Sequence, residues 1–292
     1  MGVIRRRTHY YFILPSLLVI LAVAVYPILH CFYLSLQRID LKLPHLGQTF
    51  IGIDNYRSLV GNVRFWKALS NTFLFTGGSV TLELLLGIGI ALVMHMRFRG
   101  RGLFRASVLV PWAVPTVVAG MMWAWIYNDQ YGVFNHLLAQ LGVIDGYIAW
   151  LGTKNTAMFS LIFADVWKTT PFMALLLLAG LQMIPDELYE SAKVDGAGTL
   201  ARFFRITLPL LTPTIAVALL FRTMDAFRIF DLVFVLTQGG PGNSTETMSL
   251  YAYKHLFSYL EFGYGSALAV VTFLCVGVMS AVYLLIMRRI GR

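Results

Sequence analysis

The sequence predicts an all-α integral membrane protein with six membrane-spanning helices and both termini in the cytoplasm. Composition is the first observation: 58% of the 292 residues are hydrophobic and only 13% are charged, whereas soluble domains are about half apolar and about one quarter charged. Long apolar runs are the second, because a membrane-spanning helix needs about 20 mostly apolar residues. The third is the placement of basic residues beside those runs, which is the signature of membrane topology.

Six apolar runs are long enough to cross a bilayer. They cover residues 10–36, 70–96, 104–128, 156–182, 209–236 and 264–287. We expect a short cytoplasmic segment over 1–9 and one transmembrane domain over 10–292, in a multi-pass protein of a bacterial or archaeal plasma (inner) membrane.

Basic residues set the predicted orientation. Thirteen of the 23 Lys and Arg fall in four segments that lie on one side if the count of six spans holds: 1–9, 97–105, 193–205 and 288–292. The three opposite loops hold seven, five of them between Arg38 and Lys67. The bias places the four segments in the cytoplasm. The net charge of +9 therefore reports topology, and we expect no nucleic-acid partner.

Several motifs of chemistry are absent from the sequence. It has no Gly-x4-Gly-Lys-Ser/Thr phosphate loop, no His-Glu-x-x-His and no Gly-x-Ser-x-Gly, so nothing predicts an ATPase, a zinc site or a serine nucleophile. Cys31 and Cys275 lie in apolar runs, which predicts no disulfide framework or cysteine metal cluster. We expect no catalytic residue, metal or bound cofactor, and hence no enzyme activity in this chain alone.

A polar loop over 183–208 interrupts the apolar spans on the predicted cytoplasmic side. Asp186 and Glu187 follow Pro185, an order that suits the first turn and positive end of a helix. The helix is predicted over 186–195, since Gly196 suits the left-handed conformation at a helix end. A second helix is expected from Thr199, with Pro209 ending it and opening the fifth span.

The spacing inside this loop is specific. Glu190, Ser191 and Ala192 precede three residues, Gly196, nine further residues and then Ile-x-Leu-Pro at 206–209. This resembles the signature Glu-Ala-Ala-x3-Gly-x9-Ile-x-Leu-Pro of permease subunits of binding-protein-dependent ABC importers, with Ser191 replacing the middle Ala. The resemblance implies that the first helix couples to a groove on a separate ATPase subunit, which uses ATP and Mg. Without it, an interfacial helical hairpin is the simpler interpretation. The expected coupling residues are Glu187, Leu188, Glu190, Ser191, Ala192, Asp195 and Gly196.

Further segments extend the resemblance over nearly the whole chain. They are FIGIDNY at 50–56, VWKTTPFMALLLLAGL at 166–181, DAFRIFD at 225–231, the Gly-Gly-Pro turn at 239–241 and FGYGSALA at 262–269. These resemble sugar permeases, most of all the trehalose/maltose type. The resemblance implies the fold of a type I ABC importer transmembrane domain, a dimeric ATPase, an extracytoplasmic solute-binding protein and a second permease subunit, with a homologous chain as the first expectation and an identical copy as the alternative. The remaining expected contacts are a sugar and membrane lipid.

Ionisable residues at membrane depth are costly and usually face a bundle interior or a cavity. Asp165 and Lys168 lie three residues apart on one helical face, where they could form an internal ion pair that is either structural or part of a pathway. Glu83 stands alone in its span, and we expect it to pack against a polar partner.

The fifth span carries a charged stripe. Arg222, Asp225, Arg228 and Asp231 recur at every third position, which on a helix gives a slowly drifting row. Carboxylates and guanidinium groups bind sugar hydroxyls, and aromatic faces cover sugar C–H groups. Two acids balance two bases, which favours a neutral sugar over an anion. A self-neutralising packing network is the alternative. The predicted substrate-pathway residues are Arg222, Thr223, Asp225, Phe227, Arg228 and Asp231.

Two other features concern the spans and outer loops. Pro111 and Pro115 should kink the third span, as prolines do in membrane helices. The loop over 129–155 has apolar residues on one helical face, which predicts a helix at the outer interface.

The predicted function is half of the translocation pathway of an ATP-driven sugar importer, for a disaccharide such as trehalose or maltose. Three alternatives stay open at this point. A self-sufficient secondary transporter would use Asp165 and Lys168, or the charged stripe, as a proton relay. An importer of another solute, such as glycerol 3-phosphate, would share the same architecture. A membrane enzyme lacks any recognisable constellation of catalytic residues in the sequence.

Overall fold

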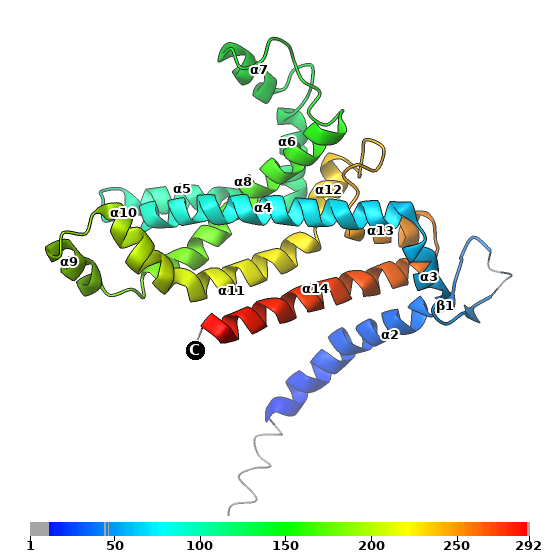
Figure 1. Cartoon of the computed structure of the whole chain (residues 1–292). Coiled ribbons are helices and arrows are strands. Elements are labelled where there is room, and N and C mark those ends of the chain that lie inside the picture. Colours follow the sequence, from blue (N-terminus) through cyan, green and yellow to red (C-terminus); the bar gives the residue numbers. More distant parts are fainter. Residues whose placement is uncertain (1–11, 44, 46, 291–292) are drawn as a thin grey trace, which may run out of the picture. The chain divides into compact units, whose positions relative to one another are not determined.

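The computed structural model describes residues 12–43, 45 and 47–290 (Figure 1). The basic N-terminal segment 1–9 lies outside the described residues. The chain clusters into two compact units, one comprising the chain up to Phe65 together with Tyr251–Leu274, the other Trp66–Leu250 and the chain from Cys275 onward. The prediction of one domain over 10–292 stays a prediction.

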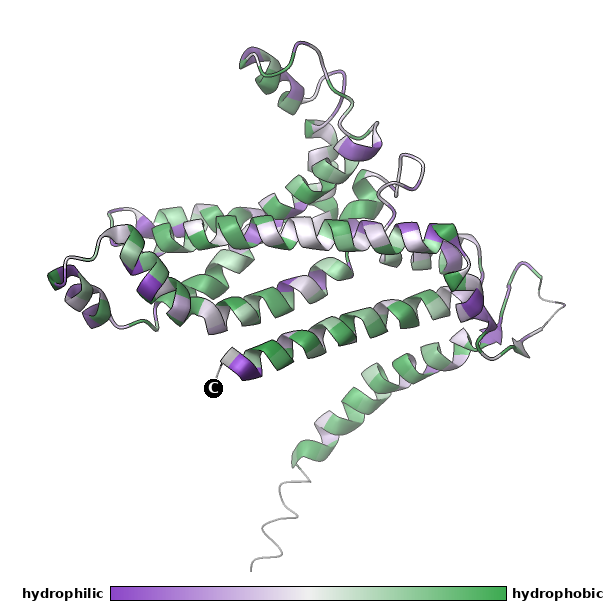
Figure 2. Cartoon of the chain, viewed as in Figure 1, coloured by the Kyte–Doolittle hydropathy of each residue, from purple (hydrophilic) through white to green (hydrophobic). Residues whose placement is uncertain are grey.

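Helices long and apolar enough to cross a membrane dominate the described residues, and Figure 2 shows that these helices consist mainly of hydrophobic residues. Five qualify singly: Phe12–Ser35, Val63–His95, Lys154–Leu181, Thr199–Phe227 and Phe262–Arg289. The pair α5 (Arg101–Ala113) and α6 (Thr116–Ile126) qualifies jointly, and counting it as one span gives six. The predicted all-α membrane class is confirmed.

The first unit begins with the helix Phe12–Ser35, which contains a π-helical turn, η1 (Leu21–Val25), and continues as α2 (Tyr26–Ser35). A two-stranded antiparallel ribbon follows, in which β1 (Gln37–Arg38) pairs with β2 (Thr49–Phe50). The unit also holds α3 (Asp54–Val60), η4 (Lys254–Ser258) and the first part of α14 (Phe262–Ile290).

The FIGIDNY segment fastens the outer loop to the end of the first helix. The side-chain amide of Asn55 donates to the backbone carbonyls of Ser35 at 2.8 Å and Gln37 at 2.9 Å. The hydroxyl groups of Tyr56 and Ser35 are 2.6 Å apart and hydrogen-bonded. Carbonyls at a helix end lack intrahelical partners, so this segment supplies the hydrogen bonds that end α2.

The second unit packs α4 (Val63–His95), α8 (Lys154–Leu181) and α11 (Leu208–Phe227) around one apolar core. Two glycines allow these helices to approach closely. A Cβ at Gly87 of α4 would lie 2.7 Å from Met173, and one at Gly180 of α8 would lie 2.5 Å from Thr214 of α11. The unit also holds α5, α6, α7 (Val133–Gln140), α9 (Asp186–Val194), α10 (Thr199–Arg202), η3 (Phe203–Thr207), α12 (Asp231–Leu236), the first part of α13 (Met248–Tyr253) and the second part of α14.

The third span is bent far more sharply than a proline kink. α5 and α6 meet at 92°, because Val114 and Pro115 between them are both extended, with ψ 130° and ψ 138°. The residue before a proline is pushed out of the helical region, so Pro115 breaks the helix completely. Pro111 stays within α5.

The fifth span differs from the prediction at both ends. The helix runs unbroken from Thr199 through Pro209 to Phe227, so the expectation that Pro209 ends the second cytoplasmic helix is wrong. The π-helical turn η3 lies just before Pro209, and in it the Leu208 N–H donates to the Phe203 carbonyl. A wider turn accommodates a proline that lacks its own N–H donor. At the other end the span stops at Phe227, and α12 begins only at Asp231.

The outer loop between α6 and α8 contains α7, close to where a helix was predicted. Asn135 at its centre is fully buried. Its side chain donates to the Ile148 carbonyl and accepts from the Ile148 N–H and the Trp150 indole N–H. This one side chain therefore closes the loop.

Candidate functional site

The break between α11 and α12 opens a cleft in the second unit. Two adjoining hollows of about 390 and 450 Å³ share four lining residues, Trp112, Thr169, Asp225 and Arg228. The first is further lined by Thr116, Asp165, Lys168, Ile229, Phe230 and Asp231, and the second by Phe172, Phe221, Arg222 and Met224. We refer to both hollows together as the cleft.

The charged row of the fifth span reaches the cleft through this break and not as a helical stripe. Arg222 and Asp225 lie on α11, Arg228 is its C-cap and Asp231 is the first residue of α12. Ending the helix at Phe227 therefore changes the spacing that a continuous helix would give, yet all four charges still line one cleft.

Aromatic side chains form part of the wall. Trp112 of α5 stacks on Phe172 of α8, with ring centroids 5.9 Å apart and planes 20° apart. Phe230 stacks on Phe234, with centroids 5.3 Å apart. Flat aromatic faces beside carboxylates and cations give the cleft both kinds of group that a sugar requires.

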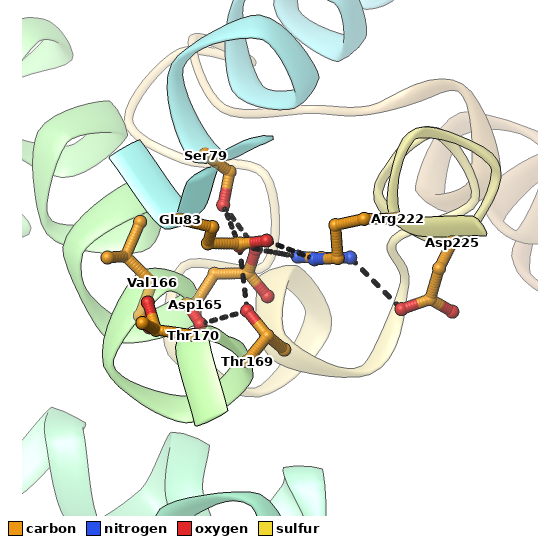
Figure 3. Close-up of polar contacts among 8 residues, drawn as sticks. All are labelled: Ser79, Glu83, Asp165, Val166, Thr169, Thr170, Arg222 and Asp225. Atoms are coloured by element: carbon orange, nitrogen blue, oxygen red, sulfur yellow. Dashed lines mark hydrogen bonds and ion pairs between the residues drawn. The ribbon is translucent and has the colours of Figure 1, made fainter. Parts of the chain in front are cut away.

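Beneath the cleft, Arg222 is the centre of a buried ion-pair cluster (Figure 3). It donates to both Glu83 oxygens, through Nε at 2.5 Å and Nη2 at 2.9 Å, and Nη2 also contacts Asp165. Its Nη1 donates to Asp225 at 3.0 Å. The Arg222 side chain is 2% exposed and that of Glu83 is 0% exposed, so this cluster joins α4, α8 and α11 away from solvent.

Two hydroxyl groups complete the cluster. The Ser79 hydroxyl of α4 lies 2.9 Å from a Glu83 oxygen and also contacts Asp165, and its one proton is shared between the two carboxylates. Thr169 of α8 bonds the Glu83 carboxylate at 2.7 Å and its own helix at the Asp165 carbonyl. Buried charges need this degree of hydrogen bonding, because removing one partner of a buried pair costs about 3–5 kcal/mol. Glu83 thus has the polar partner that was expected of it.

The predicted Asp165–Lys168 ion pair is wrong. Asp165 pairs with Arg222, whose guanidinium reaches both buried carboxylates from α11. Lys168 instead lines the cleft. Glu83, alone in its span, indicated a polar partner somewhere in the bundle, but only the packing of α11 identifies that partner as Arg222.

Two predicted pathway residues lie outside the cleft lining. Thr223 is hydrogen-bonded to the Tyr283 hydroxyl at 3.0 Å. Phe227 is fully buried with its ring against Phe73, at a centroid distance of 5.2 Å. Sequence reasoning also missed Trp112 and Thr169 as lining residues, because they come from other spans.

The loop with the signature spacing forms α9, which ends where it was predicted to end. Asp195 caps the helix and Gly196 follows with φ +78°. The N–H of Ala197 then bonds the Ala192 carbonyl at 2.8 Å. None of the α9 residues is buried in the chain, and Figure 1 shows α9 projecting beyond the ends of α4 and α11.

A few contacts hold α9 to the bundle. The Tyr189 hydroxyl is 3.0 Å from that of Thr207, and Arg97 donates to Asp186 at 3.1 Å. Leu188 stays exposed and Val194 is 88% exposed. The helix thus has one tethered side and one side open to another protein.

A family model decides the identity of the chain. The model described as binding-protein-dependent transport system inner membrane component matches residues 83–292. The chain belongs to that family. It is a permease subunit of an inner-membrane importer, as the signature spacing indicated.

Curated relatives span nearly the whole permease. The trehalose/maltose transport system permease protein MalF of Thermococcus litoralis is 46% identical over 283 residues, covering 97% of this chain and 93% of that protein. The sulfoquinovosyl glycerol transport system permease protein SmoG of Agrobacterium fabrum is 43% identical over 94% of this chain and 88% of that protein. The trehalose transport system permease protein SugA of Mycobacterium tuberculosis is 41% identical over 96% and 88%.

Solved structures share the fold. A bacterial ABC transporter involved in the import of the acidic polysaccharide alginate superposes with a TM-score of 0.83, covering 99% of this permease and 98% of that chain at 24% identity. The architecture of an ABC importer transmembrane domain is therefore confirmed for this permease.

Proposed function

We propose that this permease forms one half of the pathway of an ATP-driven importer of a neutral sugar, and that the cleft contacts the sugar. The observation that carries the proposal is the cleft itself, where three carboxylates, three basic side chains and the Trp112–Phe172 stack line the two adjoining hollows. Such groups bind hydroxyls and cover apolar sugar faces.

Charge in the cleft favours a neutral substrate. Acidic and basic side chains balance: Asp165, Asp225 and Asp231 line the cleft together with Lys168, Arg222 and Arg228. An anion such as a phosphate ester would need an excess of cations, which weighs against the glycerol 3-phosphate alternative. Relatives named for trehalose and maltose make a disaccharide the first candidate.

Energy would reach the cleft through α9. In this proposal a separate dimeric ATPase, which binds ATP and Mg, receives α9 in a groove. Its contact residues are Glu187, Leu188, Glu190, Ser191, Ala192, Asp195 and Gly196. None of the α9 residues is buried in the chain, which supports the proposal, as does the family to which the permease belongs.

Two further proteins complete the proposed importer. A solute-binding protein would deliver the sugar from outside, as the family description implies. A second permease subunit would provide the other half of the pathway. The most apolar stretch of the helix Phe12–Ser35 has no buried residue, so that helix offers a full surface to lipid or to a partner subunit.

Reconstitution tests the proposal. Proteoliposomes would contain this permease, its partner permease and the ATPase, with the solute-binding protein on the receptor side and radiolabelled trehalose or maltose as probes. We expect uptake that requires ATP and the binding protein and is unaffected by a protonophore. Uptake by this chain alone that a protonophore abolishes would instead establish a secondary transporter.

A variant tests the role of the cleft. D225N removes one exposed cleft charge, and we expect it to weaken sugar binding by about tenfold, the value of one hydrogen bond to a charged group. Unchanged binding by D225N would exclude the cleft as the sugar site.

A further inference from the structure

We propose that Arg222 is a positioning residue that orients the Asp225 carboxylate in the cleft and does not itself bind the sugar. The inference rests on the proposed function, because it names how the sugar site is held. It also revises the sequence-based expectation that Arg222 is a substrate contact.

The Arg222 guanidinium is already committed to protein partners. Nε and Nη2 donate to Glu83, Nη2 also contacts Asp165, and Nη1 donates to Asp225. A guanidinium has five N–H donors in a rigid plane, and here each of its three nitrogens faces a carboxylate. With 2% of its side chain exposed, Arg222 has little surface left for a ligand.

Asp225 has the opposite environment. Its side chain is 71% exposed and lines both hollows of the cleft. Within the described residues, Arg222 is the only side chain that hydrogen-bonds it, and it uses one carboxylate oxygen. An exposed carboxylate without such a bond would lose rotamer entropy when it binds a ligand, so holding it beforehand favours binding.

Arg222 is itself held from two other helices. Glu83 of α4 binds it through two parallel N–H···O bonds, and Asp165 of α8 binds it from beside Glu83 (Figure 3). Paired bonds of this kind fix direction as well as distance. The orientation of Asp225 on α11 therefore depends on side chains of α4 and α8.

A double-mutant cycle tests this dependence. The complete importer, with its ATPase and partner permease, would be placed in nanodiscs without the solute-binding protein. Binding of radiolabelled trehalose, with maltose as second probe, would be measured for wild type, R222K, D225N and R222K/D225N. Lysine keeps the charge but cannot make the planar paired bonds.

The inference predicts a non-additive cycle. D225N should weaken binding by about tenfold and R222K by about three- to tenfold, while the double variant should match D225N. If R222K weakens binding by the same factor in the D225N background as in wild type, Arg222 has a general packing role and the inference is overturned. Sugar binding by R222K that equals wild-type binding would also overturn it. No effect of D225N would overturn the cleft proposal instead.

Two additions keep the result decisive. If R222K fails to assemble, E83Q takes its place, because it weakens the hydrogen bonds that hold Arg222 and should give the same non-additive pattern with D225N. T170V is the matched control, because the Thr170 hydroxyl bonds the Val166 carbonyl of its own helix and takes no part in the cluster. A cryo-EM structure of R222K gives a readout without sugar. We expect the Asp225 side chain to leave its wild-type position with α4, α8 and α11 in place, and an unmoved Asp225 would contradict the inference.

Discussion

At the scale of single residues, the cluster around Arg222 places one cation among three carboxylates. Glu83 and Asp165 are buried with it, and Asp225 reaches solvent in the cleft. Desolvation makes such a cluster a weak source of stability, although breaking it is expensive. We therefore interpret the cluster as fixing the positions of side chains. The packing of α4, α8 and α11 elsewhere in the bundle offsets the free-energy cost of desolvating it.

Adjacent threonines on α8 provide an isosteric test of the cluster. T169V removes a hydrogen bond to the buried Glu83 carboxylate and should lower the free energy of unfolding by about 1–2 kcal/mol. T170V removes only a bond to its own helix and should change stability little. Thermal unfolding of the purified complex in detergent measures both, and equal losses would show that the Glu83 contact has no special weight.

The sequence predicts such contacts less well the further apart along the chain the two contacting residues lie. Glu83, alone in an apolar span, predicts that a polar partner exists, because an unpaired charge at membrane depth is costly. Its partner Arg222 lies 139 positions away, and only the packing of α11 against α4 brings them together. The nearby Lys168 is the partner that local spacing favours for Asp165, and it is the wrong one.

At the scale of elements, α9 is the best predicted part of the molecule. Its start, its end and the glycine after it follow from local rules of helix termination. Gly196 has φ +78° and Gly198 has an ordinary negative φ, while a Cβ at either position would meet no atom within 4 Å. Neither site is crowded, so the left-handed conformation of Gly196 is what an added Cβ would strain there.

This difference predicts unequal effects of two alanine variants. G196A must adopt a left-handed conformation, which costs about 1 kcal/mol, and should tilt or fray the end of α9. We expect reduced uptake per ATP hydrolysed in G196A and normal coupling in G198A, measured in proteoliposomes. Equal coupling in both variants would contradict a role for the exact α9 termination.

The proline-containing elements were harder to predict. Pro115 was expected only to kink its span and Pro209 to end a helix, yet Pro115 lies at a complete break between two helices and Pro209 lies inside a continuous one. The π-helical turn η3 makes the difference. Its presence depends on how the helix packs, and no short-range pattern in the sequence indicates it.

In the first unit, a charge cluster joins the outer loop to the start of α14. Lys42 bonds Glu261 at 3.0 Å, and His255 bonds the other Glu261 oxygen at 2.7 Å. Burial alone raises the Glu261 pKa, but the bonds from Lys42 and His255 outweigh it, so the Glu261 pKa lies below its ordinary value. The hydrogen bond to Glu261 raises the Lys42 pKa.

The directions of these shifts set a pH dependence. Because the folded-state pKa of Glu261 is lowered, its contribution to stability is present above the ordinary pKa of about 4.3 and is lost as pH falls through the lowered value. For Lys42 the contribution is lost only as pH rises above about 10.4.

Hydrogen exchange at the backbone amides of Leu41 and Phe262, which bond across this junction, measures the effect. After correction for intrinsic rates, we expect protection to fall in acid in wild type. E261Q should show low protection at neutral pH and no further acid loss. D54N, which breaks only an exposed pair with Arg57, is the control. Unchanged protection in E261Q would contradict this account.

At the scale of the whole molecule, the cytoplasmic loop and the cleft share two helices. α8 leads into α9, and the helix Thr199–Phe227 leads out of the loop that follows it. The same two helices carry Asp165 and Arg222. A displacement of α9 by an ATPase would thus act on both helices whose side chains hold the cleft, which gives the proposed coupling a continuous physical route.

The most direct test of this account is a cross-link between α9 and the ATPase. A single cysteine would replace Ala192 in a C31A/C275A background, with Leu141 of the outer loop, 74% exposed, replaced in the control. The account predicts a reducible cross-link from position 192 to the ATPase that stops ATP-driven sugar uptake until it is reduced, and none from position 141. Failure of position 192 to reach the ATPase, or uptake that continues with the cross-link formed, would contradict it.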